Sequence, residues 1–196
     1  MPSEIVLRSC LQNRSFGEMM KTESFISVDI EASGPIPGEY SMLSVGACLV
    51  FATEARFSCE LKPINGKFDP NALKVTGYSL EHFEERGLDP AAAMQTFKNW
   101  IMSVTEVGSV PVFVGFNAPF DWSFINYYFH RFLGGNPFGF TALDIKAFYM
   151  GQHKTSWAET KSSAIAKVLN VEQAGDHNPL HDAIYQAEIL KHLMSK

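Results

Sequence analysis

Apolar residues recur with two different periods along the chain, and this divides it into a strand-rich part and a helix-rich part. Residues 25–31 predict a first strand, and residues 42–50 and 55–62 predict a second and a third that turn at Thr53 and Glu54. Because short links join these strands, we expect them to form an antiparallel meander.

After residue 63 the apolar positions follow the helical period, interrupted by two more strands. The fully apolar residues 111–116 predict a central strand covered on both faces, and residues 140–145 predict a short fifth strand. Helix-start signals and amphipathic patterns predict helices that open at Asp69-Pro70, Ser79 and Asp89-Pro90, that follow Asn117 and Asp144, and that span 161–169 and 180–194. A meander followed by alternating strands and helices indicates a single α/β domain with a mixed sheet.

Length and charge restrict the function classes. The chain has 196 residues, 46% of them hydrophobic, which suits one domain with a sizeable core. It carries 16 basic and 21 acidic residues, a formal charge of −5. This balance excludes a protein that holds nucleic acid by a broad basic surface. It does not exclude a nucleic-acid enzyme, because metal ions in an acidic cleft can meet the phosphate locally.

Cysteine usage and the first residues bear on the compartment. The three cysteines, Cys10, Cys48 and Cys59, form no Cys-x-x-Cys pair, so neither a disulfide framework nor a zinc site is indicated. Cys48 and Cys59 would face each other across the predicted hairpin, where we expect free thiols. Residues 1–24 lack the apolar centre of a signal peptide, and no apolar run is long enough to span a bilayer. We therefore expect a cytoplasmic protein with an N-terminal extension, residues 1–24, and a domain over 25–196.

The first strand ends in a pair of acids. In an extended strand Asp29 and Glu31 project to the same face, where their charges repel. A hard divalent cation between them would relieve that repulsion. A strand that simply runs into a solvated loop is the more common explanation of an isolated Asp-x-Glu, so other residues must decide.

Two later segments supply further acids and a histidine. Asp121 falls in the first turn of a predicted helix, where favourable interaction with the helix dipole is the purely structural explanation. His177 lies in a loop five residues before Asp182, which opens the last helix. A mobile imidazole beside a fixed carboxylate suits proton transfer near neutral pH. Asp182 could complete, with Asp29 and Glu31, a cluster of oxygen ligands for Mg²⁺ or Mn²⁺.

Taken in order, these segments resemble the motifs of the DEDD superfamily of 3′-to-5′ exonucleases, in its DEDDh branch. The first motif, Asp-x-Glu, is matched by residues 29–31, and the second, Asn-Ala-x-Phe-Asp, by residues 117–121. The third, His followed by four residues and Asp, is matched by residues 177–182, and Thr76-Gly77 resembles the family's midsection. The resemblance covers roughly residues 25–194.

The resemblance implies a ribonuclease H-like fold with a five-stranded mixed sheet, its first three strands antiparallel and helices on both faces. It implies hydrolysis of single-stranded DNA or RNA from the 3′ end, with release of nucleoside 5′-monophosphates. Two divalent cations, Mg²⁺ or Mn²⁺, would be held by Asp29 between them, by Glu31 and Asp182 at the tighter site and by Asp121 at the other. His177 would be the general base, and the adjacent His181 would point elsewhere.

The resemblance also implies contacts to the terminal nucleotide. The residues expected to line its site are Ser33, Gly34, Met42, Leu43, Asn117 and Phe124. Apolar and aromatic side chains can wedge against a base without reading its identity. Phe124 is explained equally well as a core residue. Lys154, Lys161 and Lys167 could steer the phosphate strand or belong to a solvated face.

Two other function classes stay open from the sequence. A catalytically silent nucleic-acid-binding or scaffold module could keep the same fold, and an endonuclease would cut circular single strands. No motif indicates whether the 2′ hydroxyl is read, so RNA and DNA are not separated. Several family members are dimers, which leaves a homodimer open for this chain.

Overall fold

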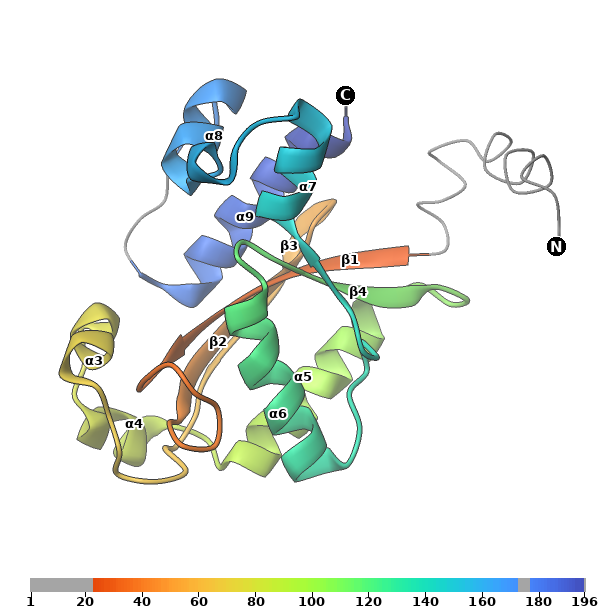
Figure 1. The fold of residues 1–196 in the computed structure, drawn as a ribbon. Coiled ribbons are helices and arrows are strands. Elements are labelled where there is room, and N and C mark those ends of the chain that lie inside the picture. Colours follow the sequence, from red (N-terminus) through yellow and green to blue (C-terminus); the bar gives the residue numbers. More distant parts are fainter. Residues whose placement is uncertain (1–22, 173–176, 196) are drawn as a thin grey trace, which may run out of the picture.

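The sheet has five strands in the order β3-β2-β1-β4-β5 (Figure 1). The computed structural model describes residues 23–172 and 177–195. The strands β1, β2 and β3 form an antiparallel meander, and β4 and β5 continue the sheet parallel to β1. Their bounds are Glu23–Ala32, Met42–Leu49, Ala52–Glu60, Val110–Gly115 and Ala142–Asp144. This confirms the predicted mixed sheet with its first three strands antiparallel.

Helices cover both faces of the sheet, as predicted. The helices α5 and α6 pack on one face, and α7, α8 and α9 pack on the other (Figure 1). The helices are α3 Pro70–Thr76, α4 Leu80–Arg86, α5 Pro90–Val104, α6 Pro119–Leu133, α7 Ile145–His153, α8 Ser162–Leu169 and α9 Pro179–Met194, with a 3₁₀ turn η1 at Trp157–Glu159. The side chains of Asp69, Ser79 and Asp89 cap α3, α4 and α5, as their positions in the sequence predicted. Among the described residues, no helix combines the length and apolar character that crossing a bilayer requires.

Side chains along β1 alternate between the two helical layers that cover the sheet. Ile26, Val28 and Ile30 are buried in the cluster formed with α5 and α6, whereas Phe25 packs in the cluster formed with α7, α8 and α9. Because side chains alternate along a strand, Asp29 lies on the α9 face of the sheet together with Glu31. The strand begins at Glu23, two residues before the predicted domain start; the predicted extension otherwise lies outside the described residues.

Gly46 lets the first turn of α9 approach the sheet. This glycine pairs with Asp29 across β1 and β2, so it lies beside the end of the acidic strand. A Cβ at Gly46 would lie 2.2 Å from the backbone nitrogen of Leu180 and 2.2 Å from the carbonyl carbon of Pro179. Backbone atoms cannot rotate away as a side chain can. The position of the α9 N-terminus therefore depends on residue 46 being a glycine, which has no side chain.

We expect Gly46→Ala to destabilise the protein by about 1–3 kcal/mol, the usual cost of overpacking a core. The same change should weaken activity, because it displaces the helix turn that carries Asp182. Chemical denaturation measures the first effect. Gly66→Ala is the matched control, since a Cβ there meets nothing within 4 Å. Equal stability of the two variants would contradict the close approach described above.

The hairpin between β2 and β3 differs from the prediction. It turns at Val50 and Phe51, earlier than Thr53 and Glu54, because β2 ends at Leu49 and β3 begins at Ala52. A register shift between Cys48 and Leu49 then pairs Cys48 with Arg56, while Cys59 pairs with Val45, so the two thiols do not face each other. Both are free, and burial raises the pKa of each to about 12. The predicted juxtaposition was wrong, and the predicted free thiols are confirmed.

Candidate active site

The end of β1 that carries Asp29 and Glu31 extends beyond the point where its pairing with the parallel strand β4 stops. Pairing between β1 and β4 stops at Ser27 and Val114, so the backbone beyond it lacks a strand neighbour on that side. Asp121 takes that place: its Oδ1 accepts a hydrogen bond of 3.1 Å from the backbone N–H of Ile30. Asp121 is buried, with 4% of its surface exposed. The first helical turn of α6 is thereby fixed against the strand that carries Asp29.

The turn from β4 into α6 is held by a second acid. Asn117 adopts a left-handed backbone conformation with φ of 62°, which asparagine tolerates better than most residues. The next N–H, that of Ala118, donates to Asp144 Oδ2 at 2.7 Å. The other carboxylate oxygen of Asp144 accepts from Ala147 N at 2.7 Å and so caps α7. Asp144 thus caps the helix that was predicted to follow it, and it also holds the segment that presents Asp121.

The helix α9 contributes Asp182 and, one turn later, Gln186. Asn178 caps this helix, and Asp182 lies in its first turn. The Gln186 side chain is buried; its Nε2 donates to Asp29 Oδ1 at 2.6 Å, while its Oε1 accepts from Phe116 N at 3.0 Å. Gln186 thus fixes the Asp29 carboxylate against the end of β4. The sequence analysis missed it, although its spacing of four residues from Asp182 places both on one helix face.

The electrostatics indicate that four carboxylates share this site. Burial raises the pKa of Asp29 well above its ordinary value, and the charges of Asp121, Asp182 and Glu31 raise it further. Burial also raises the pKa of Asp121 to about 7, and burial together with Asp182 raises the pKa of Glu31 to about 7. Such a set of hard oxygen donors is the kind that divalent cations such as Mg²⁺ and Mn²⁺ prefer. The residues present therefore fit a divalent cation.

The raised pKa values predict that the metal-free protein loses stability as the pH rises. The folded protein holds Glu31 with a pKa of about 7 against an ordinary 4.5, so it binds more protons than the unfolded chain between these values. The stabilisation that comes from this extra proton is fully present below the ordinary pKa of 4.5 and is lost as the pH rises through about 7. For Glu31 the loss is on the order of 3 kcal/mol. Thermal unfolding in EDTA between about pH 5 and pH 8 measures the loss.

Two comparisons make this stability measurement specific. Glu31→Gln should reduce the pH dependence without abolishing it, because it removes one titrating group and leaves Asp29 and Asp121, whose pKa values are also raised. Millimolar Mn²⁺ should restore stability at the higher pH and have little effect at the lower one, since protons and cations compete for the same carboxylates. A metal-free protein whose melting temperature stays level or rises across this range would contradict the assignment.

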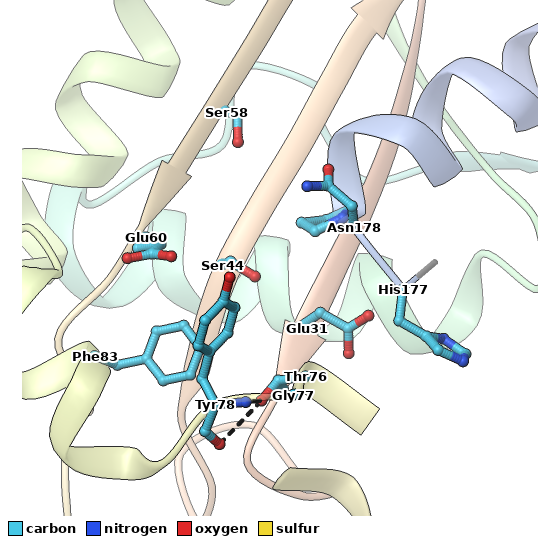
Figure 2. A pocket seen from close by; sticks show the side chains of 11 residues that line it. Glu31, Ser44, Ser58, Glu60, Thr76, Gly77, Tyr78, Phe83, His177 and Asn178 are labelled. Carbon is cyan, nitrogen blue, oxygen red and sulfur yellow. Dashed lines mark hydrogen bonds between the residues drawn. The ribbon is translucent and has the colours of Figure 1, made fainter. Parts of the chain in front are cut away.

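His177 lies beside this cluster. One ligand atom each of His177, Glu31 and Asp182 lie within 4.8 Å of one another. Figure 2 shows the His177 imidazole beside the Glu31 carboxylate, with His177 on the segment that leads into α9. His177 is exposed and has a left-handed φ of 52°. The structure thus brings together all five residues that the sequence predicted as the catalytic set, while His181 is an exposed residue of α9.

Glu31 separates two cavities. One, of about 330 Å³, is lined mainly by apolar groups: Ala32, Gly34, Pro35, Ala72, Val75 and Phe120, with Asp69 at its side. The other, of about 430 Å³, extends from Glu31 and His177 across the sheet to Glu60 and Phe83 (Figure 2). The first has the size and apolar walls of a site for a flat ring, and the second is lined by hydroxyls and acids.

Some of the residues predicted to contact the substrate are accessible in the structure, and others are buried. Gly34 lines the apolar cavity, as expected of a contact residue, and Asn117 is exposed at the turn before α6. Met42, Leu43 and Phe124 are completely buried in hydrophobic clusters and offer no surface to a base, so their prediction as a wedge is corrected. Strand β2 is covered on both faces, which leaves its apolar residues no outward side. Phe120, 37% exposed, lines the cavity in their place.

Ser33 has a structural part in this site. It is completely buried; its Oγ donates to Lys67 O and accepts from Ser41 N. Its own backbone N–H donates to Ser41 O, and its carbonyl accepts from Asp69 N. These bonds shape the loop that follows Glu31. Both donors of Ser33, its hydroxyl and its backbone N–H, are engaged within the protein and are not available to the terminal nucleotide in this structure.

A curated relative is similar in sequence to most of this chain. The 3′-5′ DNA exonuclease Cap18 of Escherichia coli is 60% identical over 169 residues, which cover 86% of this chain and 90% of that protein. The chain belongs to the family of 3′-5′ exonucleases represented by Cap18. The resemblance stated from the sequence motifs is therefore confirmed. No family model matches the chain.

Solved structures of DEDDh exonucleases share the fold. The nuclease domain of 3′hExo, a DEDDh family member bound to rAMP, superposes with a TM-score of 0.69 at 17% identity, covering 85% of this chain and 88% of that one. The zinc-bound complex of E. coli ExoI with ssDNA gives a TM-score of 0.65 at 16% identity, over 89% of this chain and 41% of that one. These similarities confirm the ribonuclease H-like fold of this exonuclease.

Proposed function

We propose that this exonuclease removes nucleoside 5′-monophosphates one at a time from the 3′ end of single-stranded DNA, using two divalent cations, Mg²⁺ or Mn²⁺. The choice of DNA rests on the name of its relative Cap18, a 3′-5′ DNA exonuclease. Support for a single strand comes from the ssDNA in the similar ExoI complex. A catalytically silent module on the same fold is the alternative.

One observation carries the proposal: four carboxylates from three distant segments converge on one spot beside an imidazole. The burial and the mutual repulsion that raise the pKa of Asp29 both cost stability. A binding module would gain nothing from that cost without cations. The arrangement therefore favours metal-dependent hydrolysis over a silent scaffold.

The roles of the residues follow from their positions. Asp29, Glu31, Asp121 and Asp182 would hold the cations, which supply charge for the scissile phosphate and the leaving 3′ oxygen. Gln186 holds one oxygen of Asp29 and so orients the other. His177 lies within reach of Glu31 and Asp182 and accepts the proton of the attacking water. Its exposed side chain can then release that proton to solvent.

The apolar cavity beside Glu31 is the proposed binding site of the terminal nucleotide. Val75 and Phe120 form its partly exposed walls, and stacking on such side chains tolerates any base. Gly34 lets the Tyr40 ring pack against the loop, because a Cβ there would lie 2.2 Å from Tyr40 Cδ1. This loop closes one side of the cavity next to the acids. A chain end would thus be held with its last phosphate near Glu31.

Digestion of matched DNA and RNA oligonucleotides, labelled at either end, tests the proposal. With Mg²⁺ or Mn²⁺ the 3′-labelled DNA should lose its label at once as a mononucleotide, and the 5′-labelled DNA should shorten in single steps. RNA should be cut more slowly, and a circular single strand should survive. No hydrolysis with either metal would favour the silent module, and cutting of the circle would indicate an endonuclease.

A further inference from the structure

One segment of this acidic protein is basic. Residues 145–171 contain four lysines, Lys146, Lys154, Lys161 and Lys167, and a single acid, Glu159, which leaves a local charge of +3 against −5 for the whole chain. Lys154, Lys161 and Lys167 are exposed. The segment comprises α7, the turn η1 and α8. A polyanion would meet a favourable local charge at this segment.

An exposed tryptophan lies in the middle of this segment. Trp157 is 53% exposed, and Lys146 Nζ lies 4.2 Å from the centroid of its ring. The turn that carries it is fixed: Glu159 accepts hydrogen bonds from the hydroxyls of Thr155 and Ser156, and the buried Thr160 donates to the carbonyl of Trp157. The ring is therefore presented to solvent on a pre-organised turn, beside a positive charge.

Two contacts attach this segment to the active site. At its start, Asp144 caps α7 and binds the N–H of Ala118, three residues before Asp121. At the start of α8, the Ser162 carbonyl accepts a 3.3 Å hydrogen bond from the hydroxyl of Tyr185, which follows Asp182 by one helical turn. Both α7 and α8 lie against α9 (Figure 1). The basic segment thus adjoins the acids of the active site.

We propose that residues 146–161 form the binding surface for the part of the single strand that lies upstream of the terminal nucleotide. A base stacks on Trp157, while Lys146 and Lys161 contact phosphates on either side of it. Aromatic stacking combined with positive charge is the usual chemistry for single strands without sequence preference. This inference rests on the proposed function and identifies where the rest of its substrate binds.

Binding and turnover of short and long substrates test this surface. Trp157→Ala should weaken the affinity of the metal-free protein for a DNA of about 15 nucleotides roughly tenfold, while Trp157→Phe should retain most of it. Lys146→Gln should reduce the slope of log affinity against log salt by about 0.7. Fluorescence anisotropy in EDTA measures both. With Mn²⁺, Trp157→Ala should raise KM for the long DNA and leave hydrolysis of a dinucleotide unchanged.

Matched controls come from the same chain. Phe140→Ala removes another exposed aromatic ring, and Lys98→Gln removes a partly exposed lysine on α5; neither should change affinity or salt slope. Unchanged affinity in Trp157→Ala, or an equal loss on the dinucleotide, would overturn this inference alone. Failure of the wild type to hydrolyse the long DNA with Mn²⁺ would overturn the proposed function, and the anisotropy measurement in EDTA would still decide the binding surface.

Discussion

Replacing Asp29 by asparagine is expected to abolish hydrolysis at every pH while making the metal-free protein more stable. Asp29 is surrounded by three other acids and by the donor group of Gln186. Asparagine keeps an oxygen for Gln186 and removes the charge. Losing the shared ligand should cost several kcal/mol of transition-state stabilisation, about 1,000-fold or more in kcat. Removing a repelled charge should raise the melting temperature in EDTA at neutral pH.

The opposite signs of the two effects separate catalysis from folding. A variant that merely unfolds would lose activity and stability together. Asp89→Asn is the matched control, because Asp89 caps α5, where asparagine serves as well. This control should keep both activity and stability. Activity of Asp29→Asn within tenfold of the wild type, or a lowered melting temperature in EDTA, would contradict the assignment of Asp29.

Removing the imidazole of His177 is expected to lower kcat at neutral pH by about 10²- to 10⁴-fold, the usual contribution of a positioned general base. Residual activity should then rise steadily with pH, because hydroxide replaces the base. The structure also places His177 close enough to Glu31 and Asp182 to be a metal ligand. Comparison of His177→Ala with the wild type for Mn²⁺ affinity distinguishes the two roles.

As a general base, His177 contributes little to metal affinity, so the Mn²⁺-induced rise in melting temperature should persist in His177→Ala. Its disappearance would instead identify His177 as a ligand. His181→Ala is the control, since this histidine lies four residues along on the surface of α9. It should keep both the activity and the Mn²⁺ effect of the wild type.

Local rules were enough to predict much of the fold. Alternation along β1 placed Asp29 and Glu31 on one face, and the structure buries Ile30 on the other. Cap signals located three helix starts, because the side chain that ends a loop also satisfies the first helical N–H groups. Such features depend on a few neighbouring residues, which is why the sequence alone contains them.

Contacts between distant segments were not readable in the same way. The hairpin register depends on which residue turns, and a turn three residues earlier than Thr53 moved Cys48 away from Cys59. Gln186 gains its role only when α9 packs beside β1 and β4, because it is separated from Asp29 by 157 positions in the sequence. Met42 was predicted as a contact residue from the family resemblance, which does not show that β2 is covered on both faces in this chain.

Isothermal titration calorimetry tests most directly whether the acidic cluster is a metal centre. The metal-free protein is titrated with Mn²⁺ in the presence of a nucleoside 5′-monophosphate. Two Mn²⁺ ions should bind per wild-type chain, and Asp29→Asn should lose at least one of them. Identical stoichiometry and heat in the two proteins, or no binding to the wild type at millimolar concentration, would contradict the account.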